Sequence, residues 1–230
     1  INSNLTMGLN IEGRRQEYNN PAWGATDIFN LVVRQSPIRE AYWPSGRAAN
    51  INGEHPVEMI KAPGYRKVNY DIFQGTLFFD QKLAFISPDL ILKGSAAIYK
   101  HHMFIKHFVV PYKTYEEDEN ENIIATRIIG GETSLSETYE AINDLTVNLS
   151  LNYNKTIRLH DISGLLLYEQ YNSKGNAFSA TKKDFPTSIK DEFFASGPNN
   201  QSITGQGIIN DVRRGLVGRF NYAFAHKYLL

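Results

Sequence analysis

The side chains best suited to bind a ligand gather in one long segment, between about residues 18 and 64. A flat aromatic ring can stack on a sugar ring, and a guanidinium can form forked hydrogen bonds with carboxylates or hydroxyls. This segment offers both groups close together, so we expect ligand contacts from Trp23, Arg39, Tyr42, Trp43 and Arg47. The alternative is that these residues pack the segment against its neighbours.

Two other groups of polar residues resemble metal sites without completing one. His101, His102 and His107 lie close in sequence, but no HExxH motif or similar ligand spacing accompanies them. The acidic run at residues 116–122 resembles the start of an EF-hand loop, but Ile123 and Ile129 stand where that loop needs glycine and glutamate. We therefore expect no metal site, and we expect the acidic run to form a solvated hairpin tip.

The sequence lacks the short motifs that mark common enzyme chemistries and cofactor sites. It contains no nucleophile elbow, phosphate-binding P-loop or dinucleotide fingerprint, and it has no cysteine for thiol catalysis or for a zinc site. Lys and Arg number 24, and so do Asp and Glu, so the net charge of zero gives no basic footprint for nucleic acid. The prediction is a non-enzymatic protein without a cofactor.

Strict alternation of apolar and polar residues predicts the strands that position these side chains. In the clearest strand, residues 145–153, leucines and valine alternate with asparagine, serine and threonine. Similar patterns occur at about residues 5–11, 73–79, 90–98, 159–171 and 216–224. The alternation slips by one residue at Ile72 and Phe73, which predicts a β-bulge there. A short helix is expected near Ile28, capped by Thr26 or Asp27.

The expected connections alternate between long and short, with approximate extents of 16–64, 84–88, 109–143, 155–158, 172–206 and 225–227. In an antiparallel meander, every long loop then lies at one end of the sheet and every short turn at the other. Outer-membrane barrels have this asymmetry, with short periplasmic turns and long extracellular loops, and with aromatic girdles for which Tyr153, Tyr168 and Tyr222 are candidates. The predicted fold class is all-β, an antiparallel meander forming part of a transmembrane β-barrel.

Two other architectures produce the same alternation and stay open at this point. One is a soluble β-sandwich that binds carbohydrate, and the other is a complete small outer-membrane barrel of about eight strands. The faces Leu5–Ile11 and Leu145–Leu151 distinguish them. These faces meet across a dry core in a sandwich, whereas they point outward from a curved sheet in a barrel wall.

Several segments resemble SusC/RagA-type TonB-dependent outer-membrane transporters of Bacteroidetes. The resemblance covers nearly the whole chain, and it rests on the order and spacing of residues 20–37, 101–108, 151–156, 160–170 and 218–230. Residues 20–37, for example, begin Asn-Pro-Ala-Trp-Gly-Ala-Thr-Asp, as in the first long barrel loop of that family. Each motif is a strand-and-turn pattern and none is a catalytic signature.

The resemblance implies a barrel of about 22 strands filled by a plug domain. Such proteins import oligosaccharides or peptides across the outer membrane, are energised by the TonB system, and are closed by a SusD-like surface lipoprotein that acts as a lid. Residues 1–230 supply about six to seven strands of that barrel, without a plug, a TonB box or the C-terminal strands. We therefore expect the chain to be a piece of a longer protein, because it starts at Ile1 and stops inside the apolar alternation at Leu230.

Overall fold

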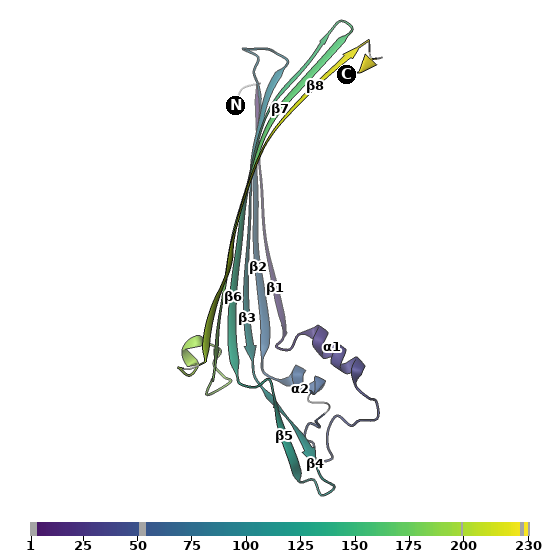
Figure 1. Ribbon diagram of the computed structural model, residues 1–230, viewed down its shortest axis with the longest axis vertical. Coiled ribbons are helices and arrows are strands. Elements are labelled where there is room, and N and C mark those ends of the chain that lie inside the picture. Colours follow the sequence, from purple (N-terminus) through teal and green to yellow (C-terminus); the bar gives the residue numbers. More distant parts are fainter. Residues whose placement is uncertain (1–3, 51–53, 199, 226–227, 230) are drawn as a thin grey trace.

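The computed structural model describes residues 4–50, 54–198, 200–225 and 228–229. These residues form one long antiparallel meander, with helices and a short hairpin from the long loops gathered at one end (Figure 1). The spatial order of the sheet is β1 (Leu5–Pro21), β2 (Tyr65–Lys82), β3 (Leu90–Val109), β6 (Ser134–Ile157), β7 (His160–Lys183), β8 (Gln201–Phe224) and β9 (Tyr228–Leu229). Every neighbouring pair is antiparallel. The prediction of an all-β meander is confirmed.

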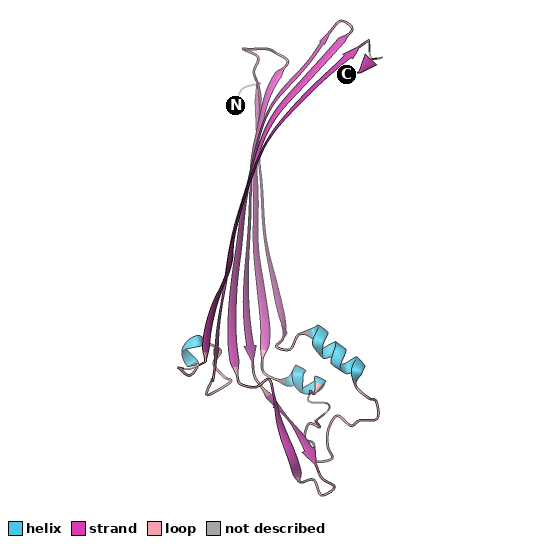
Figure 2. Cartoon of the chain, viewed as in Figure 1, coloured by secondary structure: helices cyan, strands magenta, loops and turns pink. Residues whose placement is uncertain are grey.

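The remaining elements all belong to the long loops, as the colouring by secondary structure shows (Figure 2). The loop between β1 and β2 carries helices α1 (Ala25–Arg34) and α2 (Pro56–Lys61). The loop between β3 and β6 carries a separate hairpin, β4 (Tyr112–Glu117) and β5 (Ile123–Ile129). The loop between β7 and β8 carries a short 3-10 helix, η1 (Phe193–Ala195). No helix among the described residues is long and apolar enough to cross a membrane.

The strands extend much further than the sequence predicted. β6, β7 and β8 each have 24 residues, or about 80 Å at 3.3 Å per residue. Residues 134–143, 172–183 and 201–206 were expected in loops and are strand, and β1 likewise continues to Pro21. Polar residues occupy both faces in much of these extensions, so no alternation reveals them, although the backbone pairing continues.

Two smaller predictions were wrong. β2 keeps one continuous register with β1 and with β3, so no bulge lies at Ile72 and Phe73. Val68, Tyr70 and Ile72 lie on the opposite face of the sheet from Phe73, Leu77 and Phe79, within the same continuous register. In addition, α1 begins after Gly24, with no side-chain cap from Thr26 or Asp27, and its Ile28 is buried while Val33 is exposed.

One face of the sheet carries an uninterrupted apolar belt near the short turns. In each strand, alternate residues share this face, and the pairing register aligns them across the sheet. The apolar belt consists of Leu5, Met7, Leu9, Ile11; Phe73, Gly75, Leu77, Phe79; Leu92, Gly94, Ala96, Ile98; Leu145, Val147, Leu149, Leu151, Tyr153; Ile162, Gly164, Leu166, Tyr168; and Leu216, Gly218, Phe220, Tyr222, Phe224. We call this side the belt face and the opposite side the polar face.

The apolar belt is exposed, which excludes a sandwich for the described residues. Leu9 is 61% exposed, Leu216 is 71% exposed, and the seven-stranded sheet is one layer along the belt (Figure 1). Leu5–Ile11 and Leu145–Leu151 lie on the same face of that layer. The sheet is also open, since β1 and β9 are its two edges, so the described residues do not close into a small barrel.

The belt runs obliquely across the strands. Val147 of β6 pairs with Gln170 of β7, which pairs with Arg214 of β8, so the apolar edge moves toward the short turns on β7 and β8. Strands that tilt relative to a horizontal band produce this displacement. Tyr153 and Tyr222 lie at the short-turn edge of the belt, as expected, whereas Tyr168 lies well inside β7 at the opposite edge.

The buried cores lie at the other end of the sheet, among the long loops. Phe108, Val110, Leu135 and Phe185 form one cluster, which folds the β7–β8 loop onto the belt face, with Phe193 packed against it. The second cluster joins α1, α2 and the β4–β5 hairpin through Ile28, Met59 and Tyr112. Trp23, one of the ligand-binding candidates of the first long loop, is packed against this second cluster.

Candidate ligand-binding site

The first long loop is attached to the β4–β5 hairpin by hydrogen bonds from both main chain and side chains. Trp43 Nε1 donates to the Tyr115 carbonyl at 2.8 Å. The Tyr115 amide donates to the Ala48 carbonyl, and the Asn50 amide donates to the Tyr115 carbonyl, each at 2.9 Å. A parallel bridge between Ala49 and Tyr115 accompanies these bonds. The two loops therefore form one unit, which we call the loop assembly.

His55 anchors this assembly from a fully buried position just before α2. Its Nδ1 accepts a hydrogen bond from the Glu58 amide at 3.2 Å and so caps the helix, and its Nε2 lies 2.6 Å from the Ala41 carbonyl. Because a carbonyl only accepts, Nε2 carries the proton and the ring is in one neutral tautomer. The Tyr112 hydroxyl accepts from the His55 amide at 3.1 Å, and burial raises the pKa of Tyr112.

Arg47 and Glu117 form the main ion pair of the assembly. Arg47 Nη1 lies 2.8 Å from Glu117 Oε1, and Ser45 Oγ donates to the same oxygen at 2.7 Å. The Glu117 side chain is only 1% exposed. Burial opposes its ionisation, but the hydrogen bonds from Arg47 and Ser45 outweigh burial, so the pKa of Glu117 is lowered. The sequence did not single out Glu117, because it is one of several carboxylates in the acidic run.

Three of the five predicted ligand residues line one pocket. Arg39, Tyr42 and Trp43 border a pocket of about 420 Å³, together with Ile38, Glu40, Ala49 and Asn50. The Tyr42 hydroxyl donates to Glu58 at 2.7 Å and accepts from Lys61 at 2.9 Å, so its ring is held in place. The pocket thus combines a fixed phenol ring and an indole with a guanidinium and a carboxylate. Ligand binding at these residues remains a prediction.

The structure places the other two predicted residues outside this pocket. Trp23 packs edge-on against Tyr112, with ring centroids 5.7 Å apart, and belongs to the second core cluster. Its indole is also packed against Gly130: a Cβ at that position would lie only 2.6 Å from the ring, and the φ of 97° is a conformation that favours glycine. Arg47 is directed to Glu117. The contacts described for these two residues are those of loop packing.

Residues 118–122 of the acidic run form the hairpin tip, as predicted, whereas Glu116 and Glu117 belong to β4 and Glu117 is buried. Asp118 Oδ1 accepts hydrogen bonds from the amides of Asn120 and Asn122, both at 2.8 Å, and Oδ2 accepts from the Asn122 side chain at 3.0 Å. These bonds from Asn122 lower the pKa of Asp118. Glu121 completes the turn with a φ of 62°, a left-handed conformation that favours glycine. The carboxylate of Asp118 is therefore occupied by the turn itself.

The three clustered histidines make different contacts: the pleat of β3 places His102 on the belt face, while His101 and His107 lie six residues apart on the polar face. His101 stacks on Tyr70 at 5.5 Å on the polar face, whereas His102 faces Tyr139 at 6.0 Å on the belt face. His107 Nε2 lies 2.8 Å from the Ala22 carbonyl. No group of three or more potential metal ligands occurs in the part of the chain that the structure describes.

A row of rings crosses three strands on the polar face, and sequence reasoning missed it. Tyr18 meets Tyr70 edge-on at 6.0 Å, His101 stacks on Tyr70, and Tyr99 stacks with His101 at 6.4 Å. We call Tyr18, Tyr70, Tyr99 and His101 the aromatic row. A pocket of about 470 Å³ borders it, lined also by Gln16, Asn20 and Arg66. Only the register of β1, β2 and β3 brings these residues together, so a single sequence cannot reveal the row.

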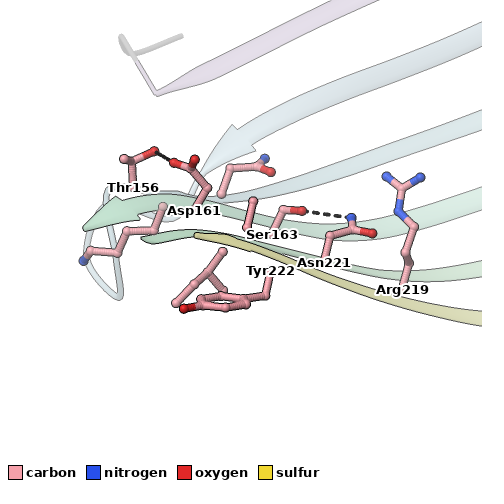
Figure 3. A pocket seen from close by; sticks show the side chains of 10 residues that line it. Thr156, Asp161, Ser163, Arg219, Asn221 and Tyr222 are labelled. Atoms are coloured by element: carbon pink, nitrogen blue, oxygen red, sulfur yellow. Dashed lines mark hydrogen bonds between the residues drawn. The ribbon is translucent and has the colours of Figure 1, made fainter. Parts of the chain in front are cut away.

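A second polar hollow lies on the sheet near the short turns (Figure 3). Its volume is about 570 Å³, and its lining comes from the ends of β6, β7 and β8. Thr156 donates to Asp161 at 2.6 Å and Asn221 donates to Ser163 at 3.0 Å, with Arg219 beside them. This surface can form hydrogen bonds with a hydrated ligand or with a polar protein segment.

Comparisons with known proteins identify the fold of this chain. No protein-family model and no curated protein matched the sequence. Among solved structures, a chain in "Structure of the RagAB peptide transporter" has a similar fold, with a TM-score of 0.70 and 16% sequence identity. The match covers 98% of this chain and 25% of the other, so this chain spans a quarter of its neighbour's length. The described meander therefore has the fold of one portion of that transporter chain.

Proposed function

We propose that this chain is a section of the barrel wall of a SusC/RagA-type TonB-dependent transporter in the outer membrane of a Gram-negative bacterium of the Bacteroidetes. The exposed apolar belt on a one-layer sheet carries the proposal. Large contiguous apolar surfaces on soluble monomers are rare, and they mark contact with a membrane or a partner. The belt on β6 measures about 26 Å along the strand, or about 20 Å along the bilayer normal at a 40° tilt, close to the 25 Å band of such barrels.

In this orientation the polar face borders the lumen, the short turns are periplasmic and the long loops are extracellular. The polar face supports this assignment because Thr146, Asn148 and Ser150 lie behind the belt residues of β6. A tilted, oblique belt is also what a closed barrel requires, since its strands incline to the axis. The strands that complete the barrel, the plug and the TonB box belong to the longer protein of which we take this chain to be a part.

The proposed activity is import of an oligosaccharide or a peptide by binding and gated passage, with no covalent chemistry and no cofactor. The pocket at Arg39, Tyr42 and Trp43 is the proposed contact at the cell surface, and the aromatic row is a further contact inside the lumen. Trp23 and Arg47 then act by holding the loop assembly in shape. A SusD-like surface lipoprotein would close over the long loops, and the TonB system would act through the plug.

The orientation can be tested in whole cells with single cysteines, because these 230 residues contain none and any cysteine elsewhere in the full-length transporter can first be replaced by serine. Ile38 in the first long loop is 90% exposed, and Phe85 in the β2–β3 turn is 83% exposed, so they form a matched pair of exposed apolar residues. In the full-length transporter on intact cells, a membrane-impermeant maleimide should label Ile38→Cys. It should label Phe85→Cys only after the outer membrane is permeabilised. Equal labelling of both variants on intact cells would contradict the proposal.

The ligand assignment needs a separate measurement on the purified full-length transporter. Calorimetric titration with a panel of oligosaccharides and peptides should yield a ligand whose affinity falls at least tenfold in Arg39→Gln, which is the loss of about one charged hydrogen bond. Arg34→Gln, an exposed arginine at the end of α1, is the matched control and should bind normally. Equal affinities in the two variants would show that Arg39 does not contact the ligand.

A further inference from the structure

On the belt face, positively charged residues follow the apolar belt directly where the belt ends toward the long loops. On β3 the next residue of this face after Ile98 is Lys100, and on β8 the next residue after Leu216 is Arg214. On β7, Gln170 and Asn172 follow Tyr168, and Lys174 comes next. All three cations are exposed. We call Lys100, Lys174 and Arg214 the cationic border.

The register brings the cationic border together. Lys100 pairs with Asn143 of β6, which pairs with Lys174 of β7, so the two lysines stand two strands apart, or about 10 Å. Asn210 pairs with Lys174, and Arg214 is four residues further along β8 toward the short turns. Amide side chains thus lie between the cations, and amides add hydrogen-bond donors to a surface of positive charge.

No carboxylate neutralises this surface. None of the three cations forms an ion pair within the described ranges, whereas Arg15, Lys93, Lys106 and Lys155 all do. Between the belt and Glu137, the belt face of β3, β6, β7 and β8 carries no Asp or Glu. On β1 and β2, in contrast, Arg15 of the same face is engaged by Glu17 and Asp71.

Among the described residues, the strands carry no such surface at the opposite edge of the belt. The strand cation on the belt face there is Lys155, which forms an ion pair with Asp89 at 3.3 Å. The exposed Arg158 lies in the β6–β7 turn, outside the strands. Within the described strands, unpaired positive charge therefore accompanies one edge of the apolar belt. A symmetric lipid environment gives no reason for this difference, whereas an asymmetric bilayer with an anionic outer surface does. Lysine and arginine at such an edge can keep their stems on the apolar surface and extend the charge outward.

We propose that the cationic border binds the phosphates of the phosphorylated glycolipid that forms the outer leaflet of the outer membrane. The proposal rests on the proposed function, which places the belt in the bilayer and the long loops outside. Arginine forms forked hydrogen bonds with phosphate, and lysine contributes a point charge. The lipid would then be held on one sector of the barrel wall, from β3 to β8. Within this sector the long-loop edge of the belt is displaced toward the short turns on β7 and β8.

The test uses the full-length transporter in detergent micelles, titrated with diphosphoryl lipid A and followed by native mass spectrometry. Each cation near an anionic lipid surface contributes about a fivefold change in affinity, so Lys100→Gln/Lys174→Gln/Arg214→Gln should weaken binding about a hundredfold. The matched control, Arg14→Gln/Lys82→Gln/Lys183→Gln, removes three positive charges from the polar face and should leave binding unchanged. Lipid A without phosphates should bind both variants and the parent equally weakly.

Two outcomes would overturn the proposal, and neither is confused with failure of the proposed function. Equal binding by the belt-face variant and the parent protein would show that the cationic border does not hold the lipid. Competition by inorganic phosphate at the same concentration as lipid A would show a site for free phosphate. Before lipid binding is compared, each protein is checked by heat-modifiable gel migration, which shows whether the barrel is folded. Failure of that check would show that the membrane assignment is wrong, independently of the lipid result.

Discussion

The short-turn half and the long-loop half of the sheet share the same strands, but they distribute apolar residues in opposite ways. In the short-turn half, most leucines of the apolar belt are exposed on one face, and none of the described residues forms a core over them. In the long-loop half, Leu135 of the same β6 strand is fully buried under Phe108 and Phe185. One strand therefore has two environments, an exposed apolar surface along the belt and a protein core among the loops.

The largest effect should come from the core of the long-loop half. Leu135→Ala removes a fully buried side chain and leaves a cavity, so we expect the loops to lose about 2 to 5 kcal/mol of local stability. Hydrogen exchange of the amides in residues 184–198 would measure this loss in the full-length protein. The control is Leu149→Ala, which leaves no enclosed cavity on the exposed belt and should leave exchange in those residues unchanged.

The next effect distinguishes the two faces of β6 within the belt. Leu149→Arg places a charge near the middle of the proposed bilayer band, which costs about 2 to 4 kcal/mol in outer-membrane barrels. Ser150→Arg, one residue away on the polar face, should cost little. Urea-induced unfolding from lipid vesicles measures the free energy of unfolding of both variants. Equal losses of this free energy would contradict the assignment of one face of β6 to the bilayer and the other to the lumen.

A pH dependence is expected only in the long-loop half, through Glu117. Its pKa lies below the ordinary value of 4.5, so its ionised form stabilises the loop assembly above that pH. The stabilisation should be lost as the pH falls through the lowered pKa, with Asp118 contributing in the same range. Exchange protection of the Asn50 amide should fall in acid in the parent protein. It should fall less in Glu117→Gln, and identical profiles would contradict the assignment.

The smallest expected effect concerns the tip of the β4–β5 hairpin. Glu121→Gly relieves a left-handed conformation at φ 62° and should stabilise the hairpin by about 0.5 to 1 kcal/mol. The control is Glu119→Gly, at a position without positive φ, which should not stabilise it. Slower exchange of the Glu121 amide, or of glycine at that position, would measure the gain.

The sequence was most informative where two different environments border the strand. In residues 145–153, leucine, valine and tyrosine alternate with asparagine, serine and threonine because the two faces of the strand differ in polarity, so the strand could be predicted together with its two faces. Residues 134–143 of β6 carry Glu137, Thr138 and Glu140, which gave no alternation, and their pairing with β7 became visible only in the structure. The segregation of long loops from short turns could be predicted because it needs only the order of strands.

The candidate site was less predictable because it depends on contacts between distant segments. Arg39, Tyr42 and Trp43 could be named from their chemistry, and they do share a pocket. The burial of Trp23 against Tyr112 and the pairing of Arg47 with Glu117 join segments about 70 to 90 residues apart, and local spacing does not encode such contacts. His55 has a local signal that could have been used, since it directly precedes Pro56 at a helix start.

The most direct test of the membrane assignment is a spin-label scan along β6 in the full-length transporter, reconstituted into lipid vesicles. Single cysteines at residues 144–153 would each carry a nitroxide, and its collisions with oxygen, which enriches in lipid, and with a water-soluble nickel complex would be compared. We expect a period of two, with oxygen contact greatest at Leu145, Val147, Leu149 and Leu151 and nickel contact greatest at the residues between them. Water-like accessibility at all positions, or protection of the belt positions from both reagents, would contradict it.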